Sequence, residues 1–485
     1  MYDVVVIGAG ITGSMIIREL TKYLLNVAII DREASPGFGV TKGGLSFIHL
    51  AHFCPPNTLK ARLCLNAPQK FKRLAEELDV TFKETGELLI ALKDEMIPEI
   101  RMRKGWGEKN GVKGLEIIDS KKVKELEPNI SDKVMAALYS WGHGLIYPPE
   151  FCFALVENAK QNGADSFFNT EVINIKKEDD GNFAIFTNKG VIKTRYIVNS
   201  AGIFADEIAD MVGDKGFKIV LTKATMAIFD KRVSSFVNHI VYAGLSSKHT
   251  QMIGPTAHGN LIMGLGYFVT PESKWDTKVT KDKLNEIIKL GLEMFPSLPV
   301  GDIITTFAGI RSENLMVPDG DFYIEYSNES KRVIHTIIGS PGVTASPSVA
   351  SMVIDMLSDA GLNLEENKRF ERYRKPFPKF SHLSLEERNN IINENRKYGH
   401  VICRCELVTE AEIKEAIARG ADTIDGIKHI TRAGMGRCQG GFCSPWVYKM
   451  LAEELKVSPK GITKKGKGSF EVIGYTKGED ENIEN

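Results

Sequence analysis

The chain opens with an apolar run from Val4 to Ile7, which predicts a buried strand. A helical spacing of apolar positions follows through "ITGSMIIREL", and a second apolar run, "NVAII", predicts a strand that ends at Asp31. Strand, helix and strand in this order are typical of a βαβ unit with parallel strands. The N-terminus therefore predicts a Rossmann-like α/β domain.

Two later stretches return to the same kind of pattern. The segment "TEVINIKKEDDGNFAIFTNKGVIKTRYIVNSAG" predicts a strand, a β-hairpin and a strand that runs into Ser200 to Gly202. Further on, "DFYIEYSNESKRVIHTIIGSPGVTASPSVASMVIDML" predicts two strands, a glycine-containing loop and a helix. We therefore expect residues 1–365 to form the α/β nucleotide domain, interrupted by an inserted α+β substrate domain that is largely antiparallel.

The last quarter of the chain has a different character. Residues 366–400 are strongly charged and contain Pro376 and Pro378, which is typical of a connector with at most a short helix. Residues 401–473 predict a small helical domain, in which Thr409 and Glu412 have the spacing of a capping box. The acidic residues 474–485 are expected to form a frayed tail.

Composition narrows the possible partners. Sixty-two lysines and arginines balance 62 aspartates and glutamates, so we expect no attraction to nucleic acid or to anionic lipid. No apolar run reaches the about 18 to 20 residues of a membrane span, and the N-terminus carries no basic leader. We expect a cytoplasmic protein with no integral membrane span, although peripheral attachment to a membrane through a partner subunit stays open.

Four of the seven cysteines, Cys403, Cys405, Cys438 and Cys443, lie close together in sequence near the end of the chain. An odd total and this clustering argue against a disulfide framework and favour a metal or cluster site. Zinc is the rival, but the usual C-x2-4-C knuckles are absent, and glycines in "GMGRCQGGFC" allow backbone N–H groups to approach the sulfurs. The spacing therefore favours a [2Fe–2S] cluster over zinc.

The glycines at 8, 10 and 13 form a dinucleotide fingerprint. In such a motif the first glycine permits a tight turn, the second lets the backbone approach a pyrophosphate, and the third lets helix and strand pack closely. Asp31, eighteen residues after Gly13, has the place of a carboxylate that binds a ribose hydroxyl. The fingerprint fits both FAD and NAD, and the return of the chain at "VNSAG" favours FAD.

Several segments of the chain resemble a known family. The segments "VIGAGITG", "EPNISDKVMAALYSWGHGLIYPPEF", "VNSAGIFADEIA", "TFAGIRSEN" and "GSPGVTASPSVA" resemble the D-amino-acid-oxidase-like superfamily of FAD-dependent oxidoreductases. Within it, the likeness is to anaerobic glycerol-3-phosphate dehydrogenase large subunits and L-2-hydroxyglutarate dehydrogenases. The tail from "ICRCELVTEAEIKEAI" to "DGIKHITRAGMGRCQGGFCSP" resembles the bacterioferritin-associated-ferredoxin-like [2Fe–2S] domain. The resemblance implies FAD and a [2Fe–2S] cluster held by the four clustered cysteines.

Oxidation of a secondary alcohol needs a hydride acceptor, a base and an anchor for the substrate's anion. The resemblance places His49 beside the flavin as the candidate base, with His52 as a weaker candidate, and points Arg311 into the substrate cavity, where a guanidinium can hold a phosphate or carboxylate. The residues expected to bind FAD are Gly8, Gly10, Ile11, Thr12, Gly13, Asp31, Arg32, Thr41, Lys42, Gly43, Gly44, Val172, Ser200, Ala201, Gly202, Arg311, Gly339, Pro341, Gly342, Val343 and Thr344.

The substrate is less sharply indicated. Thr41-Lys42 stand where the glycerol-phosphate enzymes tend to carry Arg-Asn, and "LAHF" follows His49 in place of their arginine–tyrosine pair. We expect a small anionic alcohol, with glycerol-3-phosphate oxidised to dihydroxyacetone phosphate and electrons passed through the cluster to a second electron-transfer subunit. The alternatives are an L-2-hydroxy acid such as 2-hydroxyglutarate, an amino acid, or a non-catalytic electron-transfer subunit.

Overall fold

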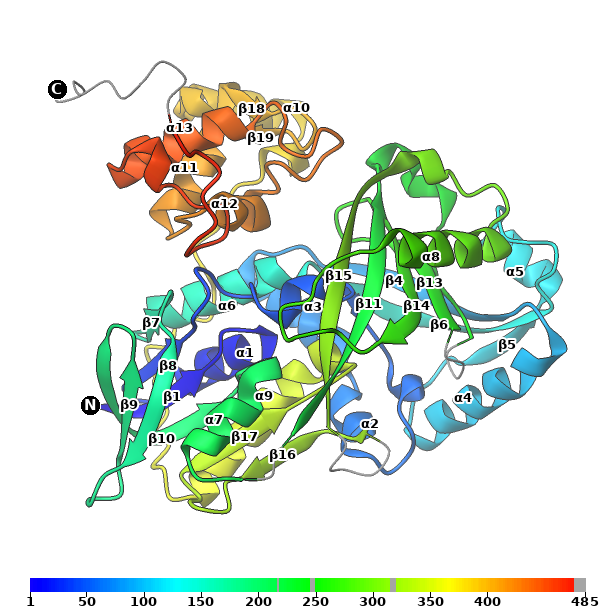
Figure 1. The fold of residues 1–485 in the computed structure, drawn as a ribbon. Coiled ribbons are helices and arrows are strands. Elements are labelled where there is room, and N and C mark those ends of the chain that lie inside the picture. The colour runs from blue at the N-terminus through cyan, green and yellow to red at the C-terminus, as the bar shows by residue number, and fades with distance from the viewer. Residues whose placement is uncertain (216–217, 245–248, 315–319, 475–485) are drawn as a thin grey trace. The chain divides into compact units, whose positions relative to one another are not determined.

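The computed structural model describes residues 1–215, 218–244, 249–314 and 320–474. The chain divides into two compact units (Figure 1). The first contains Met1–Asp31 and Pro36–Lys375, and the second contains Arg32–Ser35 and Pro376–Asn485. The division after Lys375 falls inside the connector that the sequence predicts for residues 366–400.

The N-terminal strand of the first unit lies at the centre of an eight-stranded sheet (Figure 1). Its main path runs β16-β17-β10-β1-β2-β7, in which β1 pairs in parallel with both β2 and β10. The strands are β1 (Tyr2–Ile7), β2 (Val27–Ile30), β7 (Asp165–Phe167), β8 (Val172–Lys177), β9 (Phe183–Thr187), β10 (Gly190–Asn199), β16 (Tyr323–Tyr326) and β17 (Val333–Ile337). The predicted Rossmann-like α/β fold is confirmed.

Both faces of this sheet are covered. Val4 and Val6 of β1 join a core with the helices α1 (Ile11–Leu20), α3 (Ala67–Leu78), α6 (Pro148–Gln161) and α9 (Gly342–Asp359). Val5 and Ile7 point the other way, into a core that includes Ile185 of β9. Because each face is buried, β1 reads as an unbroken apolar run instead of an alternating one.

A second sheet of nine strands forms the inserted part of the first unit. Its path is β15-β11-β14-β13-β12-β4-β6-β3, with β5 paired to β6, and only the β4–β12 pair among these named strands is parallel. The strands are β3 (Phe47–Ile48), β4 (Lys83–Ala91), β5 (Glu116–Asp119), β6 (Ala136–Leu145), β11 (Ile219–Phe229), β12 (Ile240–Ala243), β13 (His249–Pro255), β14 (Leu261–Val269) and β15 (Ile303–Asn314). The predicted, largely antiparallel insertion is thus confirmed.

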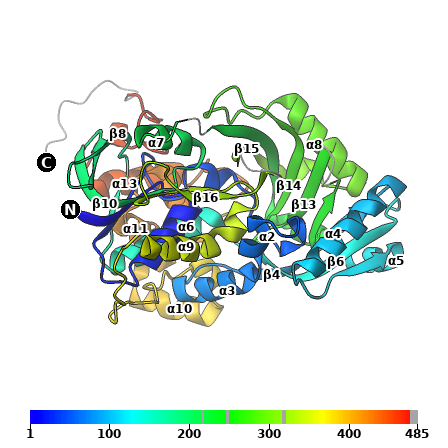
Figure 2. The ribbon, with the colours of Figure 1, turned by 90° about the horizontal axis from the view of Figure 1, so that it is seen from below.

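Helices cover the second sheet on both sides. Leu88 and Ile90 of β4 share a core with Ile287 of α8 (Lys281–Met294), which Figure 2 shows along β13 and β14. Leu89 and Ala91 face the opposite way and share a core with Ile100 of α4 (Ile97–Lys109). Smaller helices of this unit are α2 (Leu59–Cys64), α5 (Ser120–Leu126) and α7 (Ala205–Met211).

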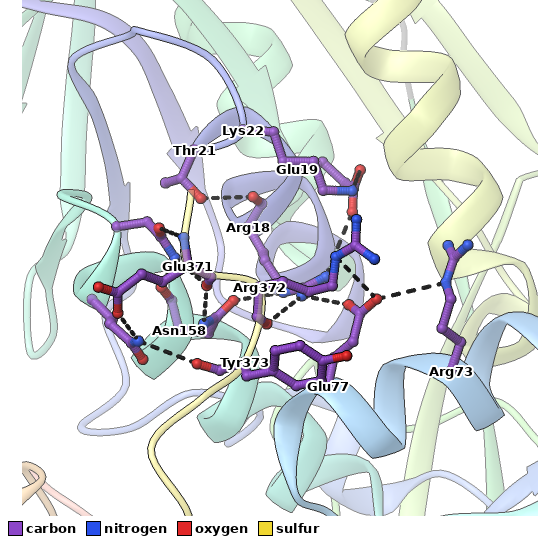
Figure 3. A network of polar contacts seen from close by, with 12 residues as sticks. Arg18, Glu19, Thr21, Lys22, Arg73, Glu77, Asn158, Glu371, Arg372 and Tyr373 are labelled. Carbon is purple, nitrogen blue, oxygen red and sulfur yellow. Dashed lines mark hydrogen bonds and ion pairs between the residues drawn. The ribbon is translucent and has the colours of Figure 1, made fainter. Parts of the chain in front are cut away.

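A buried arginine holds the end of the first unit in place (Figure 3). Arg18 of α1 is 1% exposed, and its Nε donates to Asn158 of α6 at 2.8 Å. Its Nη2 donates to Glu77 of α3 at 2.6 Å and to the carbonyl of Arg372 at 3.1 Å. One guanidinium therefore joins three elements and the segment that leads out of the unit.

The second unit is small and mainly helical. It contains a short hairpin, β18 (Val401–Cys403) with β19 (Val408–Thr409), and the helices α10 (Leu385–Glu394), α11 (Glu410–Ala418), α12 (Ile424–Thr431) and α13 (Ser444–Leu455). The predicted capping box is present, because Glu412 N–H donates to Thr409 Oγ1 while Thr409 N–H donates to the Glu412 carboxylate. Ile413, Ile427 and Leu451 are fully buried in this unit.

Candidate active site and iron–sulfur centre

The predicted nucleotide segments meet at the glycine turn after β1. Gly8 has a φ of +103°, and a Cβ on it would lie 2.3 Å from the carbonyl oxygen of Ser200. A Cβ on Gly13 would lie 1.9 Å from the Gly8 carbonyl oxygen. Ile11 N–H donates to Thr41 Oγ1 at 3.1 Å, which adds the 41–44 segment to this group. Backbone is thus packed against backbone where a pyrophosphate needs close approach.

Asp31 lies at the end of β2, beside the same turn. Its Oδ2 accepts the Ala9 N–H at 2.6 Å, and its carbonyl accepts the Thr170 N–H at 2.9 Å, just before Val172 opens β8. The carboxylate is therefore fixed next to the glycine turn, where a ribose would come. Arg32 belongs to the second compact unit, and its predicted contact with the cofactor stays a prediction.

The remaining predicted segments gather around β15. A Cβ on Gly309 would lie 2.1 Å from the Gly43 carbonyl oxygen, so the 41–44 segment rests directly on this strand two residues before Arg311. A Cβ on Gly339 would lie 2.7 Å from the Ser312 carbonyl oxygen, which ties the 339–344 segment to the same strand. Thr344, in the first turn of α9, accepts the His49 N–H at 3.1 Å. His49, Arg311 and these loops consequently share one region.

His49 belongs to a buried cluster of three histidines around one carboxylate. Its Nδ1 lies 3.2 Å from Glu87 Oε2, and His52 Nε2 lies 3.0 Å from Glu87 Oε1. His143 Nδ1 lies 3.4 Å from Glu87 Oε2, and its Nε2 bonds Ser140 Oγ at 2.8 Å. Glu87 and His52 are 1% exposed and His143 is 0% exposed, so water does not solvate this carboxylate.

A β-bulge brings His143 to the cluster. Strand β6 pairs with β4 so that Ser140 faces Glu87, but the pairing then skips Gly142, and His143 faces Thr85. If Gly142 were paired in regular alternation, His143 would point to the opposite face of the sheet, because side chains alternate along a strand. Gly142 has a φ of +95°, the backbone conformation that such a bulge requires.

The charges in this cluster are set by burial and by hydrogen bonds. Burial alone would raise the pKa of Glu87, but the interaction with His143 and the hydrogen bonds from His49 and His52 outweigh it and lower that pKa. Burial lowers the pKa of His143 to about 3 in spite of Glu87. His143 is therefore neutral near pH 7, and the hydrogen bonds from the other two histidines keep Glu87 ionised.

Tyr242 of β12 connects this cluster with Arg311. Its ring centroid is 6.0 Å from that of His49. Burial raises the pKa of Tyr242, the charge of Glu87 raises it further, and the charge of Arg311 opposes the rise. The substrate-domain residues Glu87, His143 and Tyr242 are absent from the sequence prediction. In the sequence, the signal that could have indicated a bulge near the Glu87 cluster is Gly142, a glycine inside a strand-like segment.

The four clustered cysteines converge in the second unit. Cys403 ends β18 and Cys443 immediately precedes α13, and both are buried, whereas Cys405 is exposed. Cys405 Sγ and Cys438 Sγ are 3.8 Å apart. A hydrogen bond with Cys443 lowers the pKa of Cys403 to about 6, and the backbone N–H groups of Gly434 and Glu406 contribute to the shift. Backbone N–H groups of Phe442 and Gly440 likewise lower the pKa of Cys438.

The four cysteines have the chemistry needed to hold a [2Fe–2S] cluster as thiolates. Thiolates are the ligands of [2Fe–2S] clusters, and backbone N–H groups directed at the sulfurs stabilise their charge. A Cβ on Gly436 would lie 2.1 Å from Cys405 Cβ, so only glycine lets the loop pass this close to a ligand. Gly436 thus allows close packing beside Cys405, and the predicted role of the other glycines of this loop stays a prediction.

A mixed sheet with a parallel β2-β1-β10-β17 centre, an inserted largely antiparallel sheet and a four-cysteine unit define a flavoprotein oxidoreductase with an iron–sulfur domain. Comparison with known proteins agrees: residues 3–356 match the family described as FAD dependent oxidoreductase, and residues 401–453 match the BFD-like [2Fe-2S] binding domain. The chain belongs to the FAD-dependent oxidoreductase family and ends in a BFD-like [2Fe–2S] domain. The predicted enzyme class and both cofactors, FAD and the [2Fe–2S] cluster, are confirmed.

Individual relatives are consistent with this assignment. A glycerol 3-phosphate dehydrogenase of Caloramator mitchellensis is 39% identical over 99% of this chain and 100% of its own. An L-2-hydroxyglutarate dehydrogenase of Salmonella houtenae is 25% identical over 73% of this chain and 92% of its own. The solved structure of L-alpha-glycerophosphate oxidase from Mycoplasma pneumoniae superimposes with a TM-score of 0.73 at 22% identity, covering 77% of this chain and 98% of that one.

The described residues contain no helix that is both long and apolar enough to traverse a bilayer.

Proposed function

We propose that the protein oxidises glycerol-3-phosphate to dihydroxyacetone phosphate. The observation that carries the proposal is the similarity to the Caloramator mitchellensis glycerol 3-phosphate dehydrogenase, which extends through both units, cysteine domain included. The grouping of His49, Arg311 and the cofactor loops in one region supports it, because the reaction needs a base and an anion anchor beside FAD.

Each residue has a distinct part in the proposed reaction. Arg311 holds the substrate phosphate with two parallel hydrogen bonds, for which the planar guanidinium is suited. His49 accepts the proton of the substrate hydroxyl. Asp31, Ser200 to Gly202 and the glycine turn hold FAD, which when bound supplies the hydride acceptor, while the [2Fe–2S] cluster supplies a one-electron carrier.

The electrons leave through the second unit in this proposal. Among the four clustered cysteines, Cys405 is exposed and Cys438 is half-buried, so this side of the cysteine site is accessible to another protein. We therefore propose a second electron-transfer protein as the acceptor. A membrane location through that partner follows only if the partner itself is bound to a membrane.

L-2-hydroxyglutarate is the second candidate substrate. The relative from Salmonella houtenae and the "LAHF" segment after His49 favour it, and Arg311 can bind a carboxylate with the same geometry as a phosphate. Anaerobic mixing of the oxidised protein with each compound decides between them. Bleaching of the visible flavin band by glycerol-3-phosphate, and not by L-2-hydroxyglutarate or by L-amino acids, is the expected result. Bleaching by 2-hydroxyglutarate alone would refute the proposal.

A further inference from the structure

Glu87 is a buried carboxylate that neither the family assignment nor the proposed reaction uses. An ionised group is costly to bury unless hydrogen bonds replace water. Here ring nitrogens of His49 and His52 contact its two oxygens at 3.2 and 3.0 Å. Two further histidines, His52 and His143, and the β-bulge at Gly142 therefore surround the carboxylate that contacts the proposed base.

The hydrogen bond between Glu87 and His49 has only one possible direction. An ionised carboxylate accepts hydrogen bonds and cannot donate them. The hydrogen must consequently be on Nδ1 of His49, and in a neutral ring the lone pair is then on Nε2. Nε2 lies on the far side of the ring from Glu87, so it is the nitrogen left for a substrate.

The other neighbours prevent Glu87 from turning away. His52 binds the second carboxylate oxygen, and α4 packs on His52 so closely that a Cβ on Gly107 would lie 2.8 Å from His52 Cβ. Nδ1 of His143 lies 3.4 Å from Glu87 Oε2, the oxygen that also contacts His49. The His143 ring is itself held by its hydrogen bond with Ser140. Arg103 of α4, which bonds the Phe53 carbonyl at 2.6 Å, also interacts electrostatically with Glu87.

We propose that Glu87 is the positioning residue of His49: it fixes the Nδ1–H tautomer and stabilises the imidazolium that forms when His49 takes the substrate's proton. The inference rests on the proposed function. As the alcohol becomes a ketone, its hydroxyl proton goes to Nε2 of His49, and FAD, when bound, would supply the acceptor for its hydride. The positive charge then created on His49 lies 3.2 Å from a carboxylate that is already oriented to receive it.

Rapid-mixing measurement of flavin reduction in full-length protein provides the kinetic test. Glu87→Gln should slow the limiting rate by about 10²- to 10⁴-fold with little change in substrate affinity, because the amide N–H favours the wrong tautomer. Glu87→Asp should recover part of the rate. The matched control is Glu127→Gln, which removes another fully buried carboxylate, 2.7 Å from His239 Nδ1, in the same unit. This control should reduce flavin at the normal rate.

A double-mutant cycle separates positioning from general structural damage. Glu87→Gln introduced into His49→Ala should cause no further loss beyond about twofold, since Glu87 acts only through His49. A further large loss in that background, or a normal rate for Glu87→Gln alone, would overturn the inference. If no substrate of the panel reduces the wild-type flavin, the proposed function fails, and the tautomer measurement decides whether Glu87 still orients His49.

Two measurements are independent of turnover. In ¹⁵N-histidine NMR of the oxidised protein, the His49 signals should show the Nδ1–H tautomer and should change to Nε2–H in Glu87→Gln. Metal analysis addresses the rival interpretation, because ligand atoms of His49, Glu87 and His143 lie within 4.8 Å of one another. Metal analysis of the wild-type protein should find iron and no zinc. Stoichiometric zinc that survives Cys438→Ala and disappears in Glu87→Gln would overturn the inference and assign the cluster to a metal ion.

Discussion

Arg18 and Glu77 form a buried ion pair, with Arg18 Nη2 2.6 Å from Glu77 Oε2 and 1% of the arginine exposed. Removal of one partner of such a pair leaves an uncompensated charge in the interior. We predict that Arg18→Met lowers the free energy of unfolding by about 3 to 5 kcal/mol, measured by denaturant titration.

The control for this prediction uses the same carboxylate. Arg73 lies 3.7 Å from Glu77 Oε1, but its side chain is 69% exposed. An exposed ion pair contributes about 0 to 1 kcal/mol, so Arg73→Met should have a small effect. Equal losses for the two variants would show that burial of Arg18 is not what makes the network in Figure 3 stabilising.

Arg311→Lys tests the proposed anion anchor. An ammonium cannot reproduce two parallel hydrogen bonds to a phosphate, so the substrate dissociation constant should rise by about 10- to 100-fold while FAD stays bound. The readout is the substrate dependence of flavin reduction. Arg195→Lys, at a partly exposed ion pair with Asp3, is the control and should leave affinity unchanged. Unchanged affinity in Arg311→Lys would assign this arginine to structure.

Cys438→Ala tests the cluster ligands. The wild-type protein should contain about two irons per chain and give a rhombic spin-half EPR signal after dithionite reduction. The variant should lose both, whereas Cys152→Ala, which alters a fully buried thiol of the first unit, should keep them. Flavin reduction by substrate should persist in Cys438→Ala, and electron transfer to an external acceptor protein should be lost. Iron retained in this variant would contradict the ligand assignment.

His335 predicts a pH dependence of stability. Its Nε2–H donates to Asp214 at 2.7 Å and its Nδ1 accepts from Asn199 at 3.0 Å, so the neutral ring is fully bonded. Burial lowers the pKa of His335, although Asp214 opposes the shift. The unfolded chain therefore binds this proton at a higher pH, near the ordinary value of about 6.5. Stability should fall as the pH drops below that value.

The slope due to this one group is at most about 1.4 kcal/mol per pH unit. Denaturant titrations between pH 7.5 and 5.5 should show a flatter dependence for His335→Gln than for the wild type. Curves that run parallel would mean that His335 binds its proton equally well in both states.

Local features of this chain follow from its sequence, whereas its long-range contacts do not. The glycine turn, Asp31 and the capping box of Thr409 depend on neighbouring residues, and each is where the sequence predicts it. Glu87 and His143 escaped prediction because their meeting depends on the pairing of β4 with β6 and on a one-residue bulge. Along a strand buried on both faces, no alternation of polar and apolar residues reveals which face a charged side chain takes.

The order of strands in the first sheet has a consequence for synthesis of the protein. Strand β1 pairs with β2 on one side and with β10 on the other, and β10 pairs with β17, so this part of the sheet is complete only after residues 199 and 337 have been made. The FAD site cannot close before almost all of the first unit exists, and the edge of β1 that pairs with β10 stays without its partner until residue 199 has been made. The cysteine unit is contiguous from Pro376 onward, apart from Arg32–Ser35, and so leaves the ribosome after the whole first unit. Flavin loading therefore reports on completion of the first unit, and cluster loading reports on the segment made last.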